Sequence, residues 1–139
     1  MNNRNAEGYH DPTAAEALAN VAREEKTAKV YKPLVYIASP FAGDVPRNIE
    51  KACGYCKFAV DRGVIPLAPH LHFPQFMDDG DAEQRELGLS FALILLGKCD
   101  RLWVFGSLSE GMKREIAKAK KRGIPIHYYN ERCEEVHSE

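Results

Sequence analysis

The chain has 139 residues, of which 45% are hydrophobic and 28% are charged, and its net charge is −1. This balance is typical of one soluble globular domain, and it argues against a strongly basic nucleic-acid-binding protein and an acidic disordered chain. The longest apolar run, around residues 91–97, is far shorter than the ~20 residues of a membrane span. The first residues contain no apolar core, so we expect a cytoplasmic protein without a signal peptide and without a membrane partner.

The chain is predicted to have three parts: a polar N-terminal extension (1–30), an α/β domain (31–130) and a charged tail (131–139). Within the extension, residues 1–12 are expected to be disordered because they are almost entirely polar. Thr13–Lys29 is rich in Ala and Glu and is predicted to form an accessory helix with a weak apolar stripe. The tail from Asn130 onward is expected to fray.

Strand-like and helix-like segments alternate along the domain. The predicted strands are 34–38, 64–68, 101–105 and 124–128, and the predicted helices are 46–62, 82–98 and a segment ending at 122. Gly63 and Gly123 are suited to the position just past a helix end, and Pro125 indicates an edge or the start of a strand. This alternation predicts a parallel sheet between two layers of helices.

Three loops are expected to meet at the carboxyl edge of such a sheet, where α/β proteins bind ligands. They are the segments 39–43, 69–74 and 106–111. Ser107 and Glu110 have the spacing of a helix capping box, and Ser109 is a rival cap. The alternative is that Ser107, Ser109 and nearby N–H groups hold a phosphate or a sugar hydroxyl.

Glu115 is the candidate catalytic residue. It lies beside an apolar helical stripe, and Gly111, one turn earlier, leaves a notch in front of its carboxylate. One interpretation is a surface carboxylate that pairs with Lys118, and the other is a nucleophile or electrostatic partner at the anomeric carbon of a sugar.

His70 and His72 are predicted to alternate across a strand end, so that only one faces the site, with His70 favoured as a substrate contact. No third ligand for a metal ion is evident beside them. Cys53 and Cys56 have CxxC spacing but fall inside a predicted helix, which favours core residues over a redox pair.

Several motifs together resemble the nucleoside 2-deoxyribosyltransferase-like superfamily, and most closely its small uncharacterised phage and bacterial branch. They are Tyr36–Phe41, Cys99–Gly106, Ser109–Glu115 and Gly123–Ile126. The resemblance implies a three-layer α/β/α fold with a four- to five-stranded, mainly parallel Rossmann/flavodoxin-like sheet. It also implies action on the N-glycosidic bond of a nucleoside or nucleotide, without metal or organic cofactor and without a nucleic-acid polymer as partner.

In that superfamily a Gly-Thr-x-x-Glu stretch supplies a nucleophilic glutamate, and the spacing of Gly111 and Glu115 maps Glu115 onto it. We therefore expect Glu115 to be catalytic. The residues expected to bind substrate are Ser39, Pro40, Phe41, His70, Gly106, Ser107, Ser109, Gly111 and Met112. A homo-oligomer is also expected.

Two features depart from the superfamily pattern. Met112 replaces the small polar residue after the glycine, and the helix before the third strand lacks the expected aspartate, with Glu86 the nearest acid. These departures favour an alternative function, a catalytically inactive nucleotide-binding module such as a sensor or a sequestering protein. An interaction protein without a small ligand is a third possibility.

Overall fold

The computed structural model describes residues 13–20 and 31–137. The described residues fall into two units, one that ends at residue 31 and one that begins at residue 32. In the first unit residues 14–20 form a helix, and Thr13 and Glu16 form a capping box at its start. The Glu16 N–H donates to Thr13 Oγ1 (3.0 Å), and the Thr13 N–H donates to Glu16 Oε2 (3.3 Å). The predicted disorder of residues 1–12 and the predicted helix beyond residue 20 lie outside the described residues.

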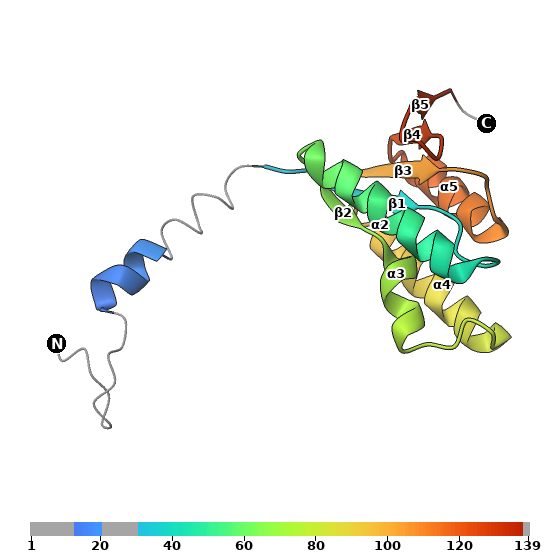
Figure 1. Cartoon of the computed structure of the whole chain (residues 1–139), viewed down its shortest axis with the longest axis horizontal. Coiled ribbons are helices and arrows are strands. Elements are labelled where there is room, and N and C mark those ends of the chain that lie inside the picture. The colour runs from blue at the N-terminus through green and yellow to red at the C-terminus, as the bar shows by residue number, and fades with distance from the viewer. Residues whose placement is uncertain (1–12, 21–30, 138–139) are drawn as a thin grey trace. The chain divides into compact units, whose positions relative to one another are not determined.

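The described part of the second unit is an α/β fold with one sheet in the strand order β2-β1-β3-β4-β5 (Figure 1). Its elements are β1 (Leu34–Ala38), α2 (Val45–Asp61), β2 (Ile65–Leu67), α3 (Pro69–His72), a 3-10 turn (Phe73–Gln75), α4 (Ala82–Leu96), β3 (Arg101–Phe105), α5 (Glu110–Arg122), β4 (Ile126–Tyr129) and β5 (Glu135–Val136). The first four strands pair in parallel and β5 pairs antiparallel with β4, which confirms the predicted fold class.

Alternating side chains of the central strands build a core on each face of the sheet. On one face Val35, Ile37 and Phe105 pack against α2. On the other face Tyr36, Leu102 and Val104 pack against α4 and α5. The strands therefore read as continuous apolar runs, because a helical layer covers both faces. Figure 1 shows α2 on the opposite side of the sheet from α4 and α5.

Local sequence signals set the helix ends. Asp44 and Asp81 accept hydrogen bonds from first-turn N–H groups of α2 and α4, and Ser109 does the same for α5. Gly123 ends α5 with φ +71°, a left-handed conformation that glycine adopts without steric cost. Among the described residues no helix is long and apolar enough to span a membrane.

The segment 69–74 was predicted to be a loop, but it forms α3 and most of the 3-10 turn. Pro69 begins α3 and Pro74 lies within the 3-10 turn, and a proline at a first helical turn forfeits no helical hydrogen bond. The two histidines therefore lie on a helical turn and not across a strand end. Pro125 precedes β4, whose two neighbours are β3 and β5, so it marks a strand start and not an edge.

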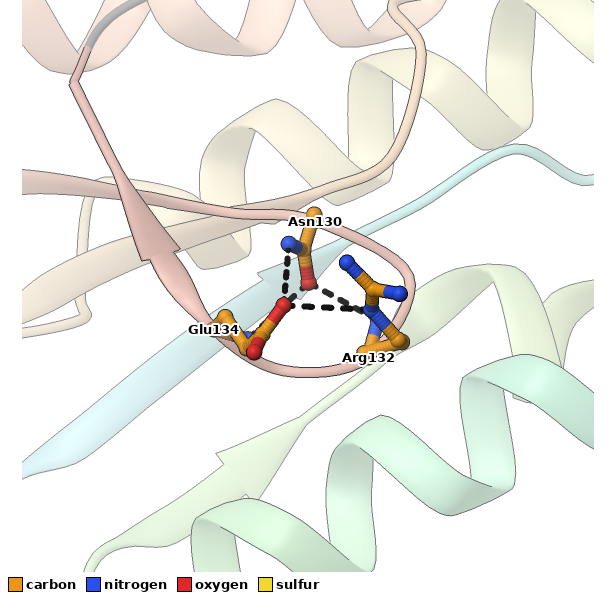
Figure 2. A network of polar contacts seen from close by, with 3 residues as sticks. All are labelled: Asn130, Arg132 and Glu134. Atoms are coloured by element: carbon orange, nitrogen blue, oxygen red, sulfur yellow. Dashed lines mark hydrogen bonds and ion pairs between the residues drawn. The ribbon is translucent and has the colours of Figure 1, made fainter.

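The tail after β4 is also more ordered than predicted, because the chain turns back and forms β5. Figure 2 shows the polar network in this turn, where Asn130, Arg132 and Glu134 converge. Asn130 Oδ1 accepts from the N–H groups of Arg132 (2.9 Å) and Glu134 (3.0 Å). Glu134 Oε1 accepts from Asn130 Nδ2 (2.9 Å) and Arg132 Nε (3.1 Å). An asparagine that bonds the backbone two residues on favours a turn, a signal that the overall charge of the tail obscures.

Candidate active site

A cavity of about 430 Å³ opens at the carboxyl ends of β1 and β3. The chain leaves β1 towards β2 on one side and returns to β3 on the other, and this change of direction is where open α/β sheets form ligand crevices. The volume lies within the range of small-molecule sites. Its lining comes from β1 and the loop after it, from α3 and the segment that follows, and from α4, α5 and the cap residue of α5. The lining residues are Tyr36, Ser39, Pro40, Phe41, Ala42, Pro69, His70, Phe73, Pro74, Met77, Asp79, Gln84, Arg85, Glu86, Gly88, Leu89, Ala92, Ser109, Glu110, Gly111, Met112, Arg114 and Glu115.

Glu115 lies on the buried face of α5 and is only 8% exposed. Ser109 caps this helix, because its Oγ accepts from the Met112 N–H at 3.2 Å. The predicted alternative of a surface pair with Lys118 is therefore wrong. The capping-box prediction for Ser107 is also wrong, because the rival cap Ser109 makes the bond. Gly111 lines the cavity beside Glu115, as the helical spacing predicted.

The Tyr36 hydroxyl donates a hydrogen bond to Glu115 Oε2. Tyr36 reaches it from the middle of β1, where it faces α4 and α5. Burial raises the pKa of Glu115 to about 7, and the hydrogen bond from Tyr36 opposes that rise by favouring the charged form. Burial and the adjacent carboxylate raise the pKa of Tyr36 well above its ordinary value, so Tyr36 stays a donor. The pair thus presents a carboxyl group that changes its charge near neutral pH.

Ser39 and His70 form a second polar pair in the cavity. Ser39 Oγ lies 2.8 Å from His70 Nε2, and Ser39 is buried directly after β1. Burial lowers the pKa of His70 to about 4, so its ring is neutral near pH 7. His72, in contrast, does not line the cavity, and its ring lies against Phe73 and Phe76. Of the two histidines only His70 lines the cavity, and both lie on a helical turn and not across the strand end that the sequence predicted.

The cavity is mostly apolar inside and charged at its mouth. Rings and methionines from four segments form the apolar wall: Phe41, Phe73, Met77 and Met112. At the mouth, Arg114 Nη1 forms an ion pair with Glu86 Oε1 at 2.8 Å, which joins α5 to α4. Arg85 Nη1 donates to the carbonyl oxygen of Asp79 at 3.2 Å, and Arg85 makes no salt bridge within the described part of the chain.

Gly106 and Ser107, predicted to bind substrate, do not line this cavity. They line a smaller hollow of about 110 Å³ on the α2 side of the sheet, together with Pro40, Asn48, Lys51, Tyr55 and Glu131. Lys51 Nζ forms an ion pair with Glu131 at 3.0 Å there. Gly106 has φ +77°, a left-handed conformation that glycine adopts without steric cost.

The other predicted contacts line the large cavity: Ser39, Pro40, Phe41, His70, Ser109, Gly111 and Met112. Sequence reasoning missed Tyr36 as a site residue. The period-two alternation of β1 would have placed it on the same side as the buried stripe of α5, but the pattern alone does not identify which helix covers that side. It also left Arg85 and Glu86 unassigned, and both line the cavity mouth.

Cys53 and Cys56 are free thiols within α2, and burial raises the pKa of Cys56 to about 11, which disfavours the reactive thiolate. Within residues 13–20 and 31–137, no group of three or more His, Cys, Asp or Glu side chains is arranged to hold a metal ion.

Comparison with solved structures shows a similar fold in a 2-deoxyribosyltransferase from the psychrotolerant bacterium Bacillus psychrosaccharolyticus. The TM-score is 0.53 at 20% sequence identity, over 70% of this chain and 72% of that chain. No curated protein matches the sequence. The family model described as "Domain of unknown function (DUF7768)" matches residues 33–129, which include all the strands that pair in parallel and both walls of the cavity. The chain therefore belongs to the family of this domain of unknown function.

Proposed function

We propose that the cavity binds a nucleoside or nucleotide and that Glu115 acts on its N-glycosidic bond. The observation that carries this proposal is the buried carboxyl group of Glu115, which lines a nucleoside-sized, mainly apolar cavity and accepts a hydrogen bond from Tyr36. Two further findings support it. The fold is similar to that of a 2-deoxyribosyltransferase, and the spacing from Gly111 to Glu115 is that of the superfamily's nucleophile motif.

The proposed reaction begins with the ionised form of Glu115. A carboxylate oxygen forms a bond to the sugar C1′ while the C1′–N bond breaks. The electron pair of the C1′–N bond passes to the base nitrogen, which takes a proton from solvent. In the second step water attacks C1′, the bond from C1′ to the Glu115 oxygen breaks, and a proton of the water passes to solvent, which releases the sugar and restores the carboxylate. Alternatively, a nitrogen of a second base attacks C1′ in place of water and loses its proton to solvent, and a new nucleoside forms. Positive charge develops on the sugar in both steps, and the carboxylate stabilises it.

The electrostatics of the site give this reaction a pH dependence. Burial holds the pKa of Glu115 at about 7, so the nucleophilic form accumulates as the pH rises through neutrality. Tyr36 favours the carboxylate by donating to it and positions one of its oxygens. We expect base release to increase between about pH 6 and pH 8 and then to level off.

The aromatic and the charged residues of the cavity suit different parts of the ligand. Phe41 and Phe73 offer ring faces for a nucleobase, and Ser39 and His70 offer hydrogen bonds to the sugar or the base. Arg85 at the mouth is a guanidinium without an acidic partner among the described residues, and it suits a 5′-phosphate. These positions favour a nucleoside monophosphate over the bare nucleoside.

A second candidate, binding without turnover, rests on the protonation states of the site. The neutral His70 is a poor acid near pH 7, and Glu86 on α4 is already engaged by Arg114. A leaving base would therefore depend on solvent for its proton. A protein that senses or sequesters a nucleotide needs the cavity and no such proton.

One experiment separates the two functions. The full chain is incubated with a panel of nucleosides and nucleoside monophosphates, and released base and thermal shift are measured together. Base release that falls by at least about 1,000-fold in Glu115→Gln supports the enzyme. Glu50→Gln, an exposed position on α2, is the matched control and should retain full activity. A thermal shift without base release supports the binding module, and neither signal with any member of the panel would contradict both.

A further inference from the structure

Helix α4 has an apolar outer face that nothing in the described structure covers. From Leu87 to Leu96 the helix carries no charged residue. Its inner side packs in the core through Ala92 and Leu96 and lines the cavity. Its outer side leaves Leu87 48%, Phe91 39% and Ile94 56% exposed.

Phe76 extends this face beyond the helix. It is 62% exposed, and Phe73 links it to α4, with ring centroids 6.0 Å from Phe76 and 5.8 Å from Phe91. We call Phe76, Leu87, Phe91 and Ile94 the α4 outer face. Helix α5, which covers the same side of the sheet, instead exposes charged residues such as Lys113, Lys120 and Lys121. A contiguous apolar patch of this kind on one helix is typical of an interaction site.

Two residues of opposite charge lie at the two ends of this face. Glu83 begins the stripe at the N-terminus of α4, and Lys98 ends it just beyond the C-terminus. Lys98 continues the last turn, since its N–H donates to the Leu95 carbonyl at 2.9 Å. Both side chains are exposed, and neither makes a salt bridge within the described part of the chain.

We infer that the α4 outer face binds a second copy of this chain, with the two α4 helices packed antiparallel about a two-fold axis. When the axis passes between Ser90 and Phe91, Glu83 lies opposite Lys98 of the second copy. The same arrangement places Leu87 opposite Ile94. Every such pair occurs twice, as the self-complementary contact of a two-fold dimer requires.

The residues at the centre suit a close crossing. Ser90 is small and exposed, and it lies opposite the Phe91 ring of the second copy, so a large side chain meets a small one on both sides of the axis. The apolar centre with charged ends follows the usual division of an interface into an apolar core and a polar rim. This inference rests on the outer side of α4 and is independent of the function proposed for the cavity on its inner side.

The first test measures the mass of the full chain by sedimentation and light scattering across a concentration series. Wild type is expected to be a dimer that dissociates on dilution. Ile94→Glu should raise the dissociation constant by on the order of 100-fold or more, because two charges would enter the apolar centre. Val60→Glu changes an equally exposed residue on α2 (57%) and should leave the dimer intact. Circular dichroism of each variant checks that it is folded.

The second test uses charge reversal, which distinguishes this pairing from any other use of the face. Glu83→Lys and Lys98→Glu should each weaken the dimer by about tenfold, because both then place like charges opposite each other. The double variant Glu83→Lys/Lys98→Glu should restore it. A wild-type monomer at every concentration, a dimer that tolerates Ile94→Glu, or a double variant as weak as the single ones would overturn the inference.

Discussion

Two hollows lie at the carboxyl edge of the same sheet, one on each face, and only one has the properties of an active site. The larger, on the side of α4 and α5, is mainly apolar and contains the buried carboxyl group of Glu115. The smaller, on the side of α2, is about 110 Å³ and contains the ion pair of Lys51 and Glu131. The loop after β3 contributes to both, with Gly106 and Ser107 on one side and Ser109 on the other. Neighbouring residues of one loop at the sheet edge can therefore line two different hollows.

The largest expected effect comes from filling the large cavity with a leucine side chain. Gly88 in α4 lines the large cavity, and a Cβ there would meet only Met77, at 3.8 Å. Gly88→Leu should therefore fold, extend into the cavity and weaken ligand binding by more than about 100-fold. The measurement is the thermal shift with a nucleoside monophosphate.

Gly54→Leu is the matched control for this change. Gly54 lies in the exposed part of α2, where a Cβ would have no neighbour within 4 Å, and both substitutions replace a helical glycine. Each should stabilise its helix slightly, because leucine has the higher helix propensity. Equal ligand binding by the two variants would show that the cavity is not the binding site.

The second effect is on stability and concerns the charge of Glu115. Its pKa in the folded protein, about 7, exceeds its ordinary value, so folding favours the protonated form. The stability that this group contributes is complete below about pH 4 and is lost as the pH rises towards 7 and above. Glu115→Gln should therefore raise the free energy of unfolding by on the order of 3 kcal/mol near pH 8, and by nothing near pH 4.

Urea unfolding at several pH values measures this difference. Glu50→Gln, which changes an exposed acid on α2, should give the same stability as wild type across the series. The pKa of His70 is lowered to about 4, so the contribution of His70 to the stability of the folded protein has the opposite sign and is lost as the pH falls. His70 is present in every variant, so its contribution cancels in the comparison. A Glu115→Gln difference that does not vary with pH would mean that the carboxyl group is not desolvated.

The third effect concerns the cation at the mouth of the large cavity. Arg85→Gln should weaken binding of a nucleoside monophosphate by about tenfold and leave binding of the matching nucleoside unchanged, because only the phosphate contacts the guanidinium. Arg47→Gln, at an exposed position on α2, should change neither. Calorimetric titration of both ligands makes the comparison, and an equal loss for the two ligands would count against a phosphate at Arg85.

The smallest effect is expected in the small hollow. The ion pair of Lys51 and Glu131 is partly exposed, with side-chain exposures of 30% and 59%, and such pairs contribute little. Lys51→Met should lower the free energy of unfolding by less than about 1 kcal/mol and leave ligand binding unchanged. Lys57→Met, which breaks the exposed pair with Asp61, provides the reference value. A large loss of ligand binding in Lys51→Met alone would assign a functional role to this hollow.

The amino-acid sequence by itself determined the elements of the domain and the position of the candidate carboxylate along it. Buried strands in a doubly covered sheet are short apolar runs, and the helices begin and end at residues with clear capping roles, so both are local signals. The placement of Glu115 beside the apolar stripe of α5 follows from the helical period alone. The proline-rich segment 69–74 and the tail were misassigned, because their helical turn and their hairpin depend on contacts that composition does not record.

Only the tertiary structure decided which of these residues share a site. Tyr36 and Glu115 are 79 positions apart, and Ser39 and His70 are 31 apart, so no local pattern links the members of either pair. The strand order and the choice of face for each helix bring them together, and the same choice sends Gly106 and Ser107 to the opposite side of the sheet. That packing decides whether Glu115 is solvated or buried. Burial in turn raises the pKa of Glu115 to about 7, on which its proposed chemistry rests.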